Sequence, residues 1–409
     1  MKAMGPIPGQ FGIDEGAELK IGGWSADELI EQAGGTPLFV YDSSIVGAQV
    51  ARFRATMPEG LALHYAVKAN PYRPLLKFLA RYVDGFDIAS AGELQMLQDA
   101  EIGGLPISFA GPGKRDTEIE AAIAANITLN VESDGEVERA LAIAELVGRP
   151  PKIAVRVNPP FGIKGSGMKM GGLASPFGVD FDRAAPLVRR VIDGGADWRG
   201  LHIFAGSQVL SAEALIEAQR ATVALAAEFA DSAGAAPSEL NLGGGFGIPY
   251  FSGEQPLDVD AVGAALAETL ARAPDILAHT RFAIELGRWL VGEAGVYLTR
   301  IVDRKVSGGR TFLVADGGLH HMLAASGNFG QLLRRNYPVA IAGRFGGAAD
   351  DEVTVTGCLC TPLDLFADEV SLPHAEPGDV VAIFCAGAYG LTASPQAFLG
   401  QPSAREMLV

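Results

Sequence analysis

The chain has 409 residues, of which 48% are hydrophobic and 20% charged, and its formal net charge is −16. This is a globular composition, and the length allows two domains. The negative charge argues against nucleic acid or an anionic membrane as a partner, because both require clustered basic residues. Three cysteines without a CxxC spacing, no leader-like N-terminus and no membrane-spanning apolar run predict a cytoplasmic protein without disulfides.

Short apolar segments alternate with helical patterns over the first two thirds of the chain. In the helical segments the apolar residues recur at three- and four-residue spacing. Strands separated by helices are typically parallel, and eight such units predict an α/β fold with a closed (β/α)8 TIM-type barrel. An open doubly wound sheet would instead carry a GxGxxG turn after its first strand, and none stands there. The predicted strands are 63–70, 85–90, 107–112, 128–133, 152–159, 200–206, 239–246 and 281–288.

Beyond about residue 290 the pattern changes to strands separated by turns, with few helices. We expect an all-β domain there, interrupted by a helix or ordered loop at LHHMLAASGNFGQLLRRNYPVAI. The N-terminal segment, to about Val40, is too short to fold alone and is expected to complete this domain. The predicted limits are 41–285 for the barrel and 1–40 with 286–409 for the β domain.

The carboxyl ends of the predicted strands carry many of the polar side chains, and (β/α)8 barrels hold their chemistry at that edge. Lys68 ends the first strand, in YAVKAN. The glycine-rich run GGGFG, at 243–247, follows another strand, and its backbone amides could approach a phosphate. A lysine beside a phosphate site suggests a Schiff base to pyridoxal phosphate (PLP). A solvated lysine and a simple tight turn are the alternatives.

Glu285 is the third feature of this edge. A carboxylate against the pyridine nitrogen of PLP would keep that nitrogen protonated. The alternative is an ion pair with Arg288, three residues further on. Ser207 and Arg288 are both suited to bind the phosphate, which favours the PLP interpretation.

The predicted β domain adds two candidates. Cys360 could donate a proton to the substrate, or it could be a small buried hydrophobic residue. Tyr389, in GAYG, could contact the phosphate or fill the core. His320 and His321 form a pair without a metal-binding spacing, so no metal is expected.

Together and in this order, the motifs resemble those of the fold-type III PLP-dependent decarboxylases, which include diaminopimelate, ornithine and arginine decarboxylases. They cover nearly the whole chain: YAVKAN, GFDIASAGEL, ISFAGPGK, LNVES, GGGFG, ELGR, a CxxxD that begins at Cys360, and GAYG. The resemblance implies α-decarboxylation of an amino acid by a head-to-tail homodimer, in which Cys360 and Asp364 reach the partner's active site. It implies Lys68, Glu285 and Cys360 as catalytic residues, Asp87, Phe204, Ser207, Gly244, Gly245, Gly247, Arg288 and Tyr389 as further cofactor contacts, and Arg288, Thr361 and Asp364 as substrate contacts.

More narrowly, the chain resembles the decarboxylases encoded with exosortase-type exopolysaccharide systems, through MGPIP, KGSGMKMGG, HIFAGSQ and GLTASPQAFL. It departs from the wider family at four places, one of which is Pro176-Phe177-Gly178, where the family has K-F-G. Phe204 stands where a histidine usually stacks on PLP, and Thr361 where an acidic residue often binds a distal amine. HHMLAASGNF replaces the R-P-x-x-Y segment that helps to bind diaminopimelate. A buried ammonium without a charged partner is costly, so the far end of the substrate is expected to be uncharged, as in an aminoacyl group on a carrier protein.

Two other functions remain open at this point. An amino-acid racemase on the same barrel would usually place arginine, not Glu285, near the pyridine nitrogen. A non-catalytic PLP carrier would usually lack the β domain and Cys360. We also expect the glycine-rich segment 164–172 to be a mobile loop that could close over the site, and Arg334–Arg335 to be the basic patch that an acidic carrier protein would require.

Overall fold

The structure is a computed structural model of the chain. It describes residues 2–12, 18–163, 165, 167–169, 171–172, 174–329, 331 and 333–409. It divides into two compact units. The barrel unit comprises Val50–Gly247 and Pro256–Gly287, and the β unit comprises Met1–Gln49, Ile248–Gln255 and Arg288–Val409. This division differs from the predicted limits of 41–285 in that the first turns of helix α2 (Ser43–Thr56) and residues 248–255 group with the β unit.

Eight parallel strands form a closed barrel in the barrel unit, as predicted. Each strand pairs with the next in chain order, and the last pairs with the first. The strands are buried on both faces, which is why they read as nearly continuous apolar runs. Their bounds are β4 (Ala62–Ala66), β5 (Gly85–Ile88), β6 (Ile107–Phe109), β7 (Thr128–Val131), β8 (Lys152–Asn158), β11 (Asp197–Ile203), β13 (Glu239–Asn241) and β14 (Arg281–Leu286).

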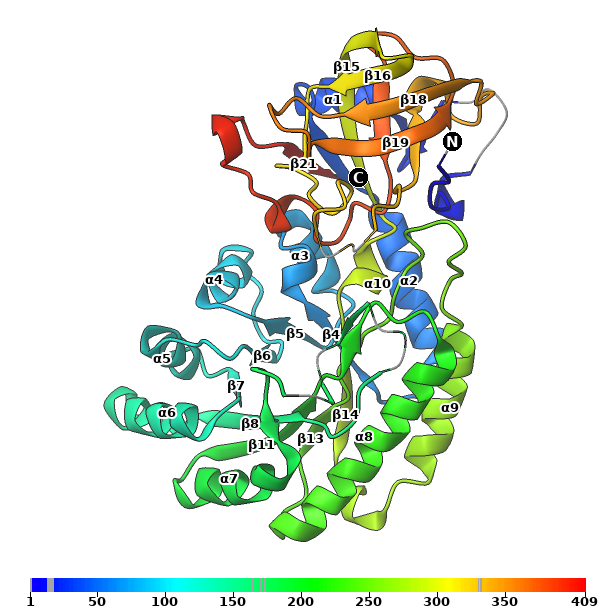
Figure 1. Cartoon of the computed structure of the whole chain (residues 1–409). Helices are drawn as coiled ribbons and strands as arrows, with labels where there is room; N and C mark the ends of the chain where they lie inside the picture. The colour runs from blue at the N-terminus through cyan, green and yellow to red at the C-terminus, as the bar shows by residue number, and fades with distance from the viewer. Residues whose placement is uncertain are drawn as a thin grey trace. The chain divides into compact units, whose positions relative to one another are not determined.

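Helices follow the strands and lie on the outside of the barrel (Figure 1). They are α3 (Arg73–Leu79), α4 (Ala91–Asp99), α5 (Asp116–Ala124), α6 (Asp134–Val147), α7 (Phe181–Asp193), α8 (Ala212–Ala233) and α9 (Val259–Ala271). Two short strands, β9 (Met168–Lys169) and β12 (Gly206–Ser207), pair with each other, and β10 (Val179–Asp180) extends the pairing of β8. Among the described residues, no helix is both long and apolar enough to cross a membrane.

Several strands end earlier than the sequence patterns predict. The strand predicted at 63–70 ends at Ala66, and Lys68 lies on the 3-10 turn Val67–Ala69 that follows. The strand predicted at 239–246 ends at Asn241, so the glycine-rich run is a loop. The apolar patterns continue beyond the hydrogen-bonded part of each strand because many of the first loop residues are also buried.

The β unit is built on the long strand β15 (Gly295–Ser307). Its first half pairs with β3 (Leu38–Tyr41) and β20 (Val380–Ile383), and its second half pairs with β16 (Arg310–Ala315). The N-terminal strand β3 is therefore part of this sheet, where the Phe39 ring lies 4.6 Å from that of Tyr297. The remaining strands of the sheet are β17 (Val339–Ile341), β18 (Asp351–Thr356), β19 (Leu365–Leu372) and β21 (Arg405–Leu408).

The segment of the β unit that precedes β3 adds a small hairpin and a helix. Strands β1 (Lys20–Ile21) and β2 (Trp24–Ser25) pair antiparallel, and helix α1 (Ala26–Ala33) follows them. Ser25 and Glu28 form a capping box at the start of α1, which satisfies two backbone donors. Helix α10 (Arg288–Val291) and the 3-10 turns of this unit are short.

Gly200 provides a test of the barrel's packing. It lies at a bulge in β11 with φ of +122°, and a β-carbon there would lie 1.9 Å from the Glu239 carbonyl oxygen. Gly200→Ala is expected to lower the free energy of unfolding by roughly 2–4 kcal/mol, from backbone strain plus overpacking. Gly135→Ala, in α6 with no atom within 4 Å of the new carbon, is the control and should leave stability unchanged or raise it. Equal urea midpoints for the two variants would contradict this account.

Candidate active site

Lys68 is presented at the carboxyl end of the barrel by its neighbours in the chain. Val67 and Ala69 on either side are buried, whereas Lys68 itself is exposed. Its Nζ lies 5.5 Å from the centre of the Phe204 ring, which follows β11. The barrel therefore brings together an accessible amine and a half-buried aromatic ring, the two groups predicted to bind and to stack on PLP.

Glu285 lies inside the barrel, near the end of β14, and is 6% exposed. Its Oε2 is 2.9 Å from Nε2 of His202 on β11. Burial by itself would raise the pKa of the Glu285 carboxyl. The charge and hydrogen bond of His202, with further contributions from Lys68 and Arg156, instead lower the pKa to about 2. Glu285 is thus a buried carboxylate that stays ionised at neutral pH, and its partner is His202 and not Arg288, the alternative considered from the sequence.

Asp87 is a second buried carboxylate in the same interior. It follows Phe86 on β5 and is 7% exposed, and neither of its oxygens accepts a hydrogen bond from the described residues. His64, on the neighbouring strand β4, brings its Nδ1 to 3.5 Å from Asp87 Oδ2. An unsatisfied buried carboxylate is costly, and this indicates that a polar group is to be bound there.

The glycine-rich run 243–247 approaches its neighbours too closely for any side chain. A β-carbon at Gly244 would lie 1.8 Å from the Glu285 carbonyl oxygen, and one at Gly245 would lie 2.4 Å from the Gly206 carbonyl oxygen. The amide of Gly247 donates to the Val209 carbonyl at 2.9 Å. Among the described residues, the amides of Gly244 and Gly245 donate to no acceptor, so these two are the ones available to an anion.

Ser207 lies on β12, which pairs with β9 in the glycine-rich segment predicted to close over the site. Within that segment, residues 164, 166 and 170 lie outside the described residues. The described part places Met168 opposite Ser207 in the two-stranded ladder. The backbone of this segment is thus joined to the strand that carries a predicted phosphate contact, and its closure over the site stays a prediction.

Other polar residues at the strand ends have structural roles. Ser90 and Ser133 cap helices α4 and α6. Their hydroxyl groups accept hydrogen bonds from the backbone amides of Glu93 and Glu136, respectively. Both serines follow strands at this edge of the barrel, and capping accounts for them. Glu132, after β7, accepts hydrogen bonds from the amides of Gly111 and Gly178 and from Arg156.

In the β unit, Arg288 forms a cluster with two tyrosines. Its Nη1 donates to Tyr250 Oη at 2.8 Å, and its guanidinium centre lies 4.6 Å from the centre of the Tyr389 ring. Burial raises the pKa of Tyr250 to about 12, so the phenol stays neutral as an acceptor. The Nε of Arg288 donates to no acceptor among the described residues. The cluster therefore holds a half-buried cation with an unused donor, as a phosphate or carboxylate contact requires.

The loop that carries Cys360 is also in the β unit. Cys360 is exposed and Thr361 is half-buried. Asp364 is 3% exposed, and its carboxylate accepts the amides of Leu319 at 2.6 Å and Leu359 at 2.8 Å. Asp364 therefore joins this loop to the segment that begins at Leu319, and its substrate-binding role stays a prediction.

The described residues from Leu319 to Phe329 form a series of turns. Of the helix and the ordered loop expected for this segment, the structure has the ordered loop. His321 is held by Tyr297 Oη at 2.9 Å and by the Pro402 carbonyl at 2.8 Å. Burial, with His321 next to it, lowers the pKa of His320 to about 4. Burial likewise lowers the pKa of His321. Both imidazoles are therefore neutral at physiological pH.

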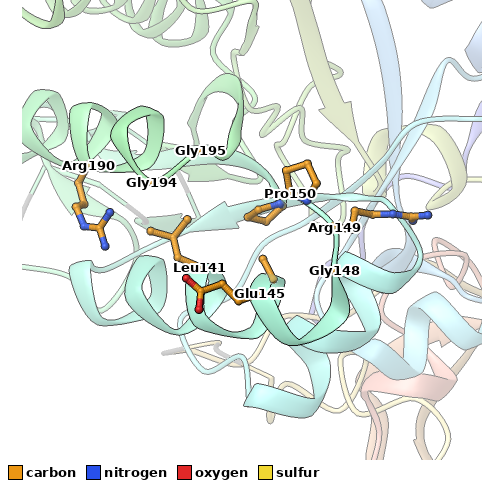
Figure 2. Close-up of a pocket in the computed structure, with 10 residues that line it drawn as sticks. Leu141, Glu145, Gly148, Arg149, Pro150, Arg190, Gly194 and Gly195 are labelled. Atoms are coloured by element: carbon orange, nitrogen blue, oxygen red, sulfur yellow. The ribbon is translucent and has the colours of Figure 1, made fainter.

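A surface hollow of about 380 Å³ lies away from these residues, between the C-terminal ends of α6 and α7 (Figure 2). Leu141 and Glu145 contribute to it from α6, and Arg190 contributes from α7. Arg190 makes a two-pronged ion pair with Glu138 at 2.7 Å. This hollow is at the amino end of β8, and none of the predicted site residues lines it.

Comparison with known proteins decides the family. The family model for the pyridoxal binding domain of pyridoxal-dependent decarboxylases matches residues 43–292. The chain belongs to this family.

Relatives and solved structures agree with this assignment. L-glutamyl-[BtrI acyl-carrier protein] decarboxylase of Niallia circulans is 35% identical over 381 residues, covering 91% of this chain and 88% of the relative. Diaminopimelate decarboxylase of Archaeoglobus fulgidus is 31% identical over 395 residues, covering 96% of this chain and 91% of the relative. The structure of diaminopimelate decarboxylase from M. jannaschii with L-lysine is 26% identical, with a TM-score of 0.85 over 97% and 92% of the two chains. The protein is therefore a PLP-dependent amino-acid decarboxylase, and the racemase and carrier alternatives receive no support.

The residues of this decarboxylase fit PLP. Lys68 supplies the amine, Phe204 an aromatic surface, and Glu285 an ionised carboxylate for a protonated ring nitrogen. The amides of Gly244 and Gly245 and the carboxylate of Asp87 supply polar groups that have no hydrogen-bond partner in the described residues. Arg288 and Tyr389 lie in the other unit, where they stay predicted phosphate contacts.

Three residues of the site were not assigned by sequence reasoning. His202 was recognised only as the first histidine of HIFAGS, without its role as the partner of Glu285. Tyr250, in GGGFGIPY, gave no signal beyond lying shortly after the glycines. His64 stands four residues before Lys68, and its position in a strand is the one clue that it faces the barrel interior.

The Glu285 carboxylate predicts a pH dependence of stability. Its pKa falls from 4.5 to about 2 on folding, so its stabilising effect is complete above about pH 4.5 and is lost as the pH falls toward 2. Glu285→Gln should therefore lose less stability than the wild type over this range, measured by urea unfolding at each pH. Glu93→Gln is the control with the opposite sign, because burial raises the pKa of Glu93. Parallel pH curves for the wild type and Glu285→Gln would contradict the assignment.

Proposed function

We propose that this decarboxylase acts on an α-amino acid whose far end is uncharged, namely an aminoacyl group tethered to a carrier protein. The observation that carries the proposal is the state of the Cys360 loop. From Gly357 to Leu365 its one carboxylate is Asp364, which is buried and accepts two backbone amides. Thr361, where the wider family often has an acidic residue, is neutral. A distal ammonium would find no free carboxylate on this loop.

The neighbouring segment supports the same conclusion. Residues 319–329 contain no acidic or permanently charged side chain. The two histidines there have lowered pKa values and are engaged with each other and with Tyr297. The segment is thus suited to a neutral thioester or amide and not to the charged end of a free diamino acid.

The reaction itself restricts how such a substrate can be tethered. Decarboxylation removes the α-carboxylate, so the bond to the carrier cannot use that group. The acyl bond must come from a side-chain carboxyl, which makes an acidic amino acid such as glutamate the simplest candidate. The Niallia circulans relative acts on an L-glutamyl carrier protein, in agreement with this chemistry.

The residues of the barrel would then divide the work. Lys68 would hold the cofactor, and Glu285, fixed by His202, would supply a carboxylate to its ring nitrogen. Bound PLP supplies the electron sink for the electron pair that remains when carbon dioxide leaves. The ionised Glu285 supports this by favouring a positive charge on the ring. Phe204 contributes stacking area but, unlike a histidine, no proton and no hydrogen bond.

We further propose that the protein is a head-to-tail homodimer and that Cys360 of one subunit returns a proton in the site of the other. Support comes from the CxxxD motif and from Cys360 being exposed in the single chain. The association with an exopolysaccharide system rests on the subgroup resemblance. Arg334 and Arg335, the predicted carrier-docking patch, are partly engaged: Arg334 donates to the Leu365 carbonyl, and Arg335 Nη1 lies 3.0 Å from Glu254 Oε1.

Carbon dioxide release tests the substrate class. The PLP-loaded protein is given meso-diaminopimelate, lysine, ornithine, arginine and glutamate as free amino acids, and glutamate tethered through its side chain to a carrier protein. Turnover confined to the tethered substrate is expected. Efficient turnover of a free diamino acid would contradict the proposal.

Thr361 provides a matched pair of variants for the same assay. Thr361→Asp restores a carboxylate after Cys360 and should raise turnover of free lysine or ornithine by about tenfold or more, because hydrogen bonds to charged groups contribute roughly 1.5–3 kcal/mol. Thr361→Asn keeps nearly the same shape without the charge and should not. An equal effect of both variants would show that charge at this position does not select the substrate.

Mixing two inactive variants tests the shared site. Lys68→Ala and Cys360→Ala homodimers should each be nearly inactive, and Lys68→Ala should also lose the visible absorption of bound PLP. If sites are shared, random exchange of subunits should restore about a quarter of wild-type activity, since half of the dimers would each hold one intact site. No recovery after exchange, verified by mass-tagged subunits, would place Cys360 in its own subunit's site or outside the reaction.

A further inference from the structure

The geometry points to His64 as a proton-exchanging residue that connects solvent at the amino end of the barrel with Asp87 in the barrel interior. This inference rests on the decarboxylase reaction but not on the identity of the substrate. It concerns a buried histidine to which the cofactor chemistry and the family motifs give no role.

His64 is placed by the strand register. On β4 it stands opposite Glu285 of β14 and Gly85 of β5. A β-carbon at Gly85 would lie 2.8 Å from His64 Nε2, so a glycine there leaves room for the imidazole. The ring is 3% exposed, and its Nδ1 lies 3.5 Å from Asp87 Oδ2. Neither of these atoms has a hydrogen-bond partner among the described residues. A distance of 3.5 Å is slightly beyond a hydrogen bond, and a small rotation of either side chain would form one.

The other side of His64 reaches a hollow. A cavity of about 400 Å³ opens at the amino ends of β4, β5, β13 and β14, and His64 is part of its lining. The hollow is large enough for several water molecules, and its walls are polar enough to hold them. Its other lining residues are Arg54, Gly60, Leu61, Ala62, Asp84, Pro106, Glu239 and Arg281.

Charged groups face His64 from each neighbouring element. Arg54 of α2 pairs with Asp84 at 2.7 Å, and Arg281 of β14 pairs with Glu239 of β13 at 2.7 Å, so the charges at the mouth balance. Inside the barrel, Asp87 and Glu285 add two carboxylates, of which Glu285 is shared with His202.

The proton affinity of His64 follows from this balance. Burial opposes a charge on His64, but the nearby charges of Asp87, Glu239 and Glu285 raise its pKa above the usual 6.5. The imidazole therefore keeps its proton to a higher pH than an ordinary histidine does. Because the pKa is raised, the proton is present at lower pH and is lost as the pH rises through the folded-state value. A histidine can in this way give up and regain a proton.

The reaction provides the reason for such a path. In α-decarboxylation the bond to the carboxylate breaks, carbon dioxide leaves, and a C–H bond forms at the α-carbon. The balance is R–CH(NH3⁺)–COO⁻ + H⁺ giving R–CH2–NH3⁺ + CO2, so each turnover consumes one proton. A substrate bound at the carboxyl end of the barrel excludes solvent from that side. The His64 imidazole has one nitrogen toward Asp87 and its other side in the hollow. It can therefore replace the consumed proton from the amino end of the barrel.

The first test observes His64 directly and needs no substrate. Full-length, PLP-loaded protein labelled at its histidine side chains is titrated by NMR, and His64→Gln assigns the resonance. We expect a titration above pH 6.5 in the wild type that moves to lower pH in Asp87→Asn. The resonance of the exposed His279 serves as the control and should be the same in both proteins. A His64 that titrates below 6.5, or that Asp87→Asn does not affect, would overturn the proposal.

The second test separates proton exchange from packing. His64→Gln should lower kcat by about a hundredfold, the lower end of the range for acid–base groups, at pH values where the wild-type imidazole holds its proton, while KM changes little. His64→Ala opens the position to the hollow, and added imidazole should restore part of the lost rate. His279→Gln is the control for activity. Equal loss at all pH values without rescue, with PLP absorption and thermal stability preserved, would show that His64 only fills space.

Discussion

The pairing of β14 with β4 closes the barrel, and the register of that pairing sets the chemistry of its interior. It places Glu285 opposite His64, and the next ladder places Ala66 opposite Asp87. Because side chains alternate across a strand, a slip of one residue would turn each of these polar groups from the interior to the helix layer. Lys68 follows two residues after Ala66, so its position at the rim depends on the same register.

Polar groups inside a barrel need partners for their hydrogen bonds and charges. In this protein some of them have such partners and others do not. Glu285 has His202 at 2.9 Å and stays ionised with a pKa of about 2. Asp87 has only a distant imidazole, and two glycine amides at the rim have no acceptor in the described part of the chain. The satisfied pair gives the site a fixed negative charge, whereas the unsatisfied groups indicate where a polar ligand adds the missing contacts. This division of roles is what a site for PLP requires.

In the β unit, by contrast, the charged groups near the Cys360 loop are already paired or are absent. Asp364, a buried carboxylate of this unit, accepts hydrogen bonds from two backbone amides. The pair His320–His321 is neutral, and Thr361 leaves the Cys360 loop without a free charge. A surface built like this discriminates against a free diamino acid mainly by failing to compensate its distal ammonium. The cation Arg288 is confined to its cluster with Tyr250 and Tyr389. The substrate preference proposed here therefore follows from missing charges as much as from contacts.

The sequence by itself determined the number and order of the barrel strands, the all-β character of the second unit and the family, because apolar periodicity and motifs such as YAVKAN and GGGFG are local. It also placed Lys68 and Glu285 at one edge, since parallel strands align their carboxyl ends. It could not separate Ser90 and Ser133, which cap helices, from residues facing the site, because both kinds of residue follow strands. Nor could it pair His202 with Glu285 or His64 with Asp87. Those pairs join residues 83 and 23 positions apart, and only the ladder register and barrel closure bring them within 2.9 and 3.5 Å.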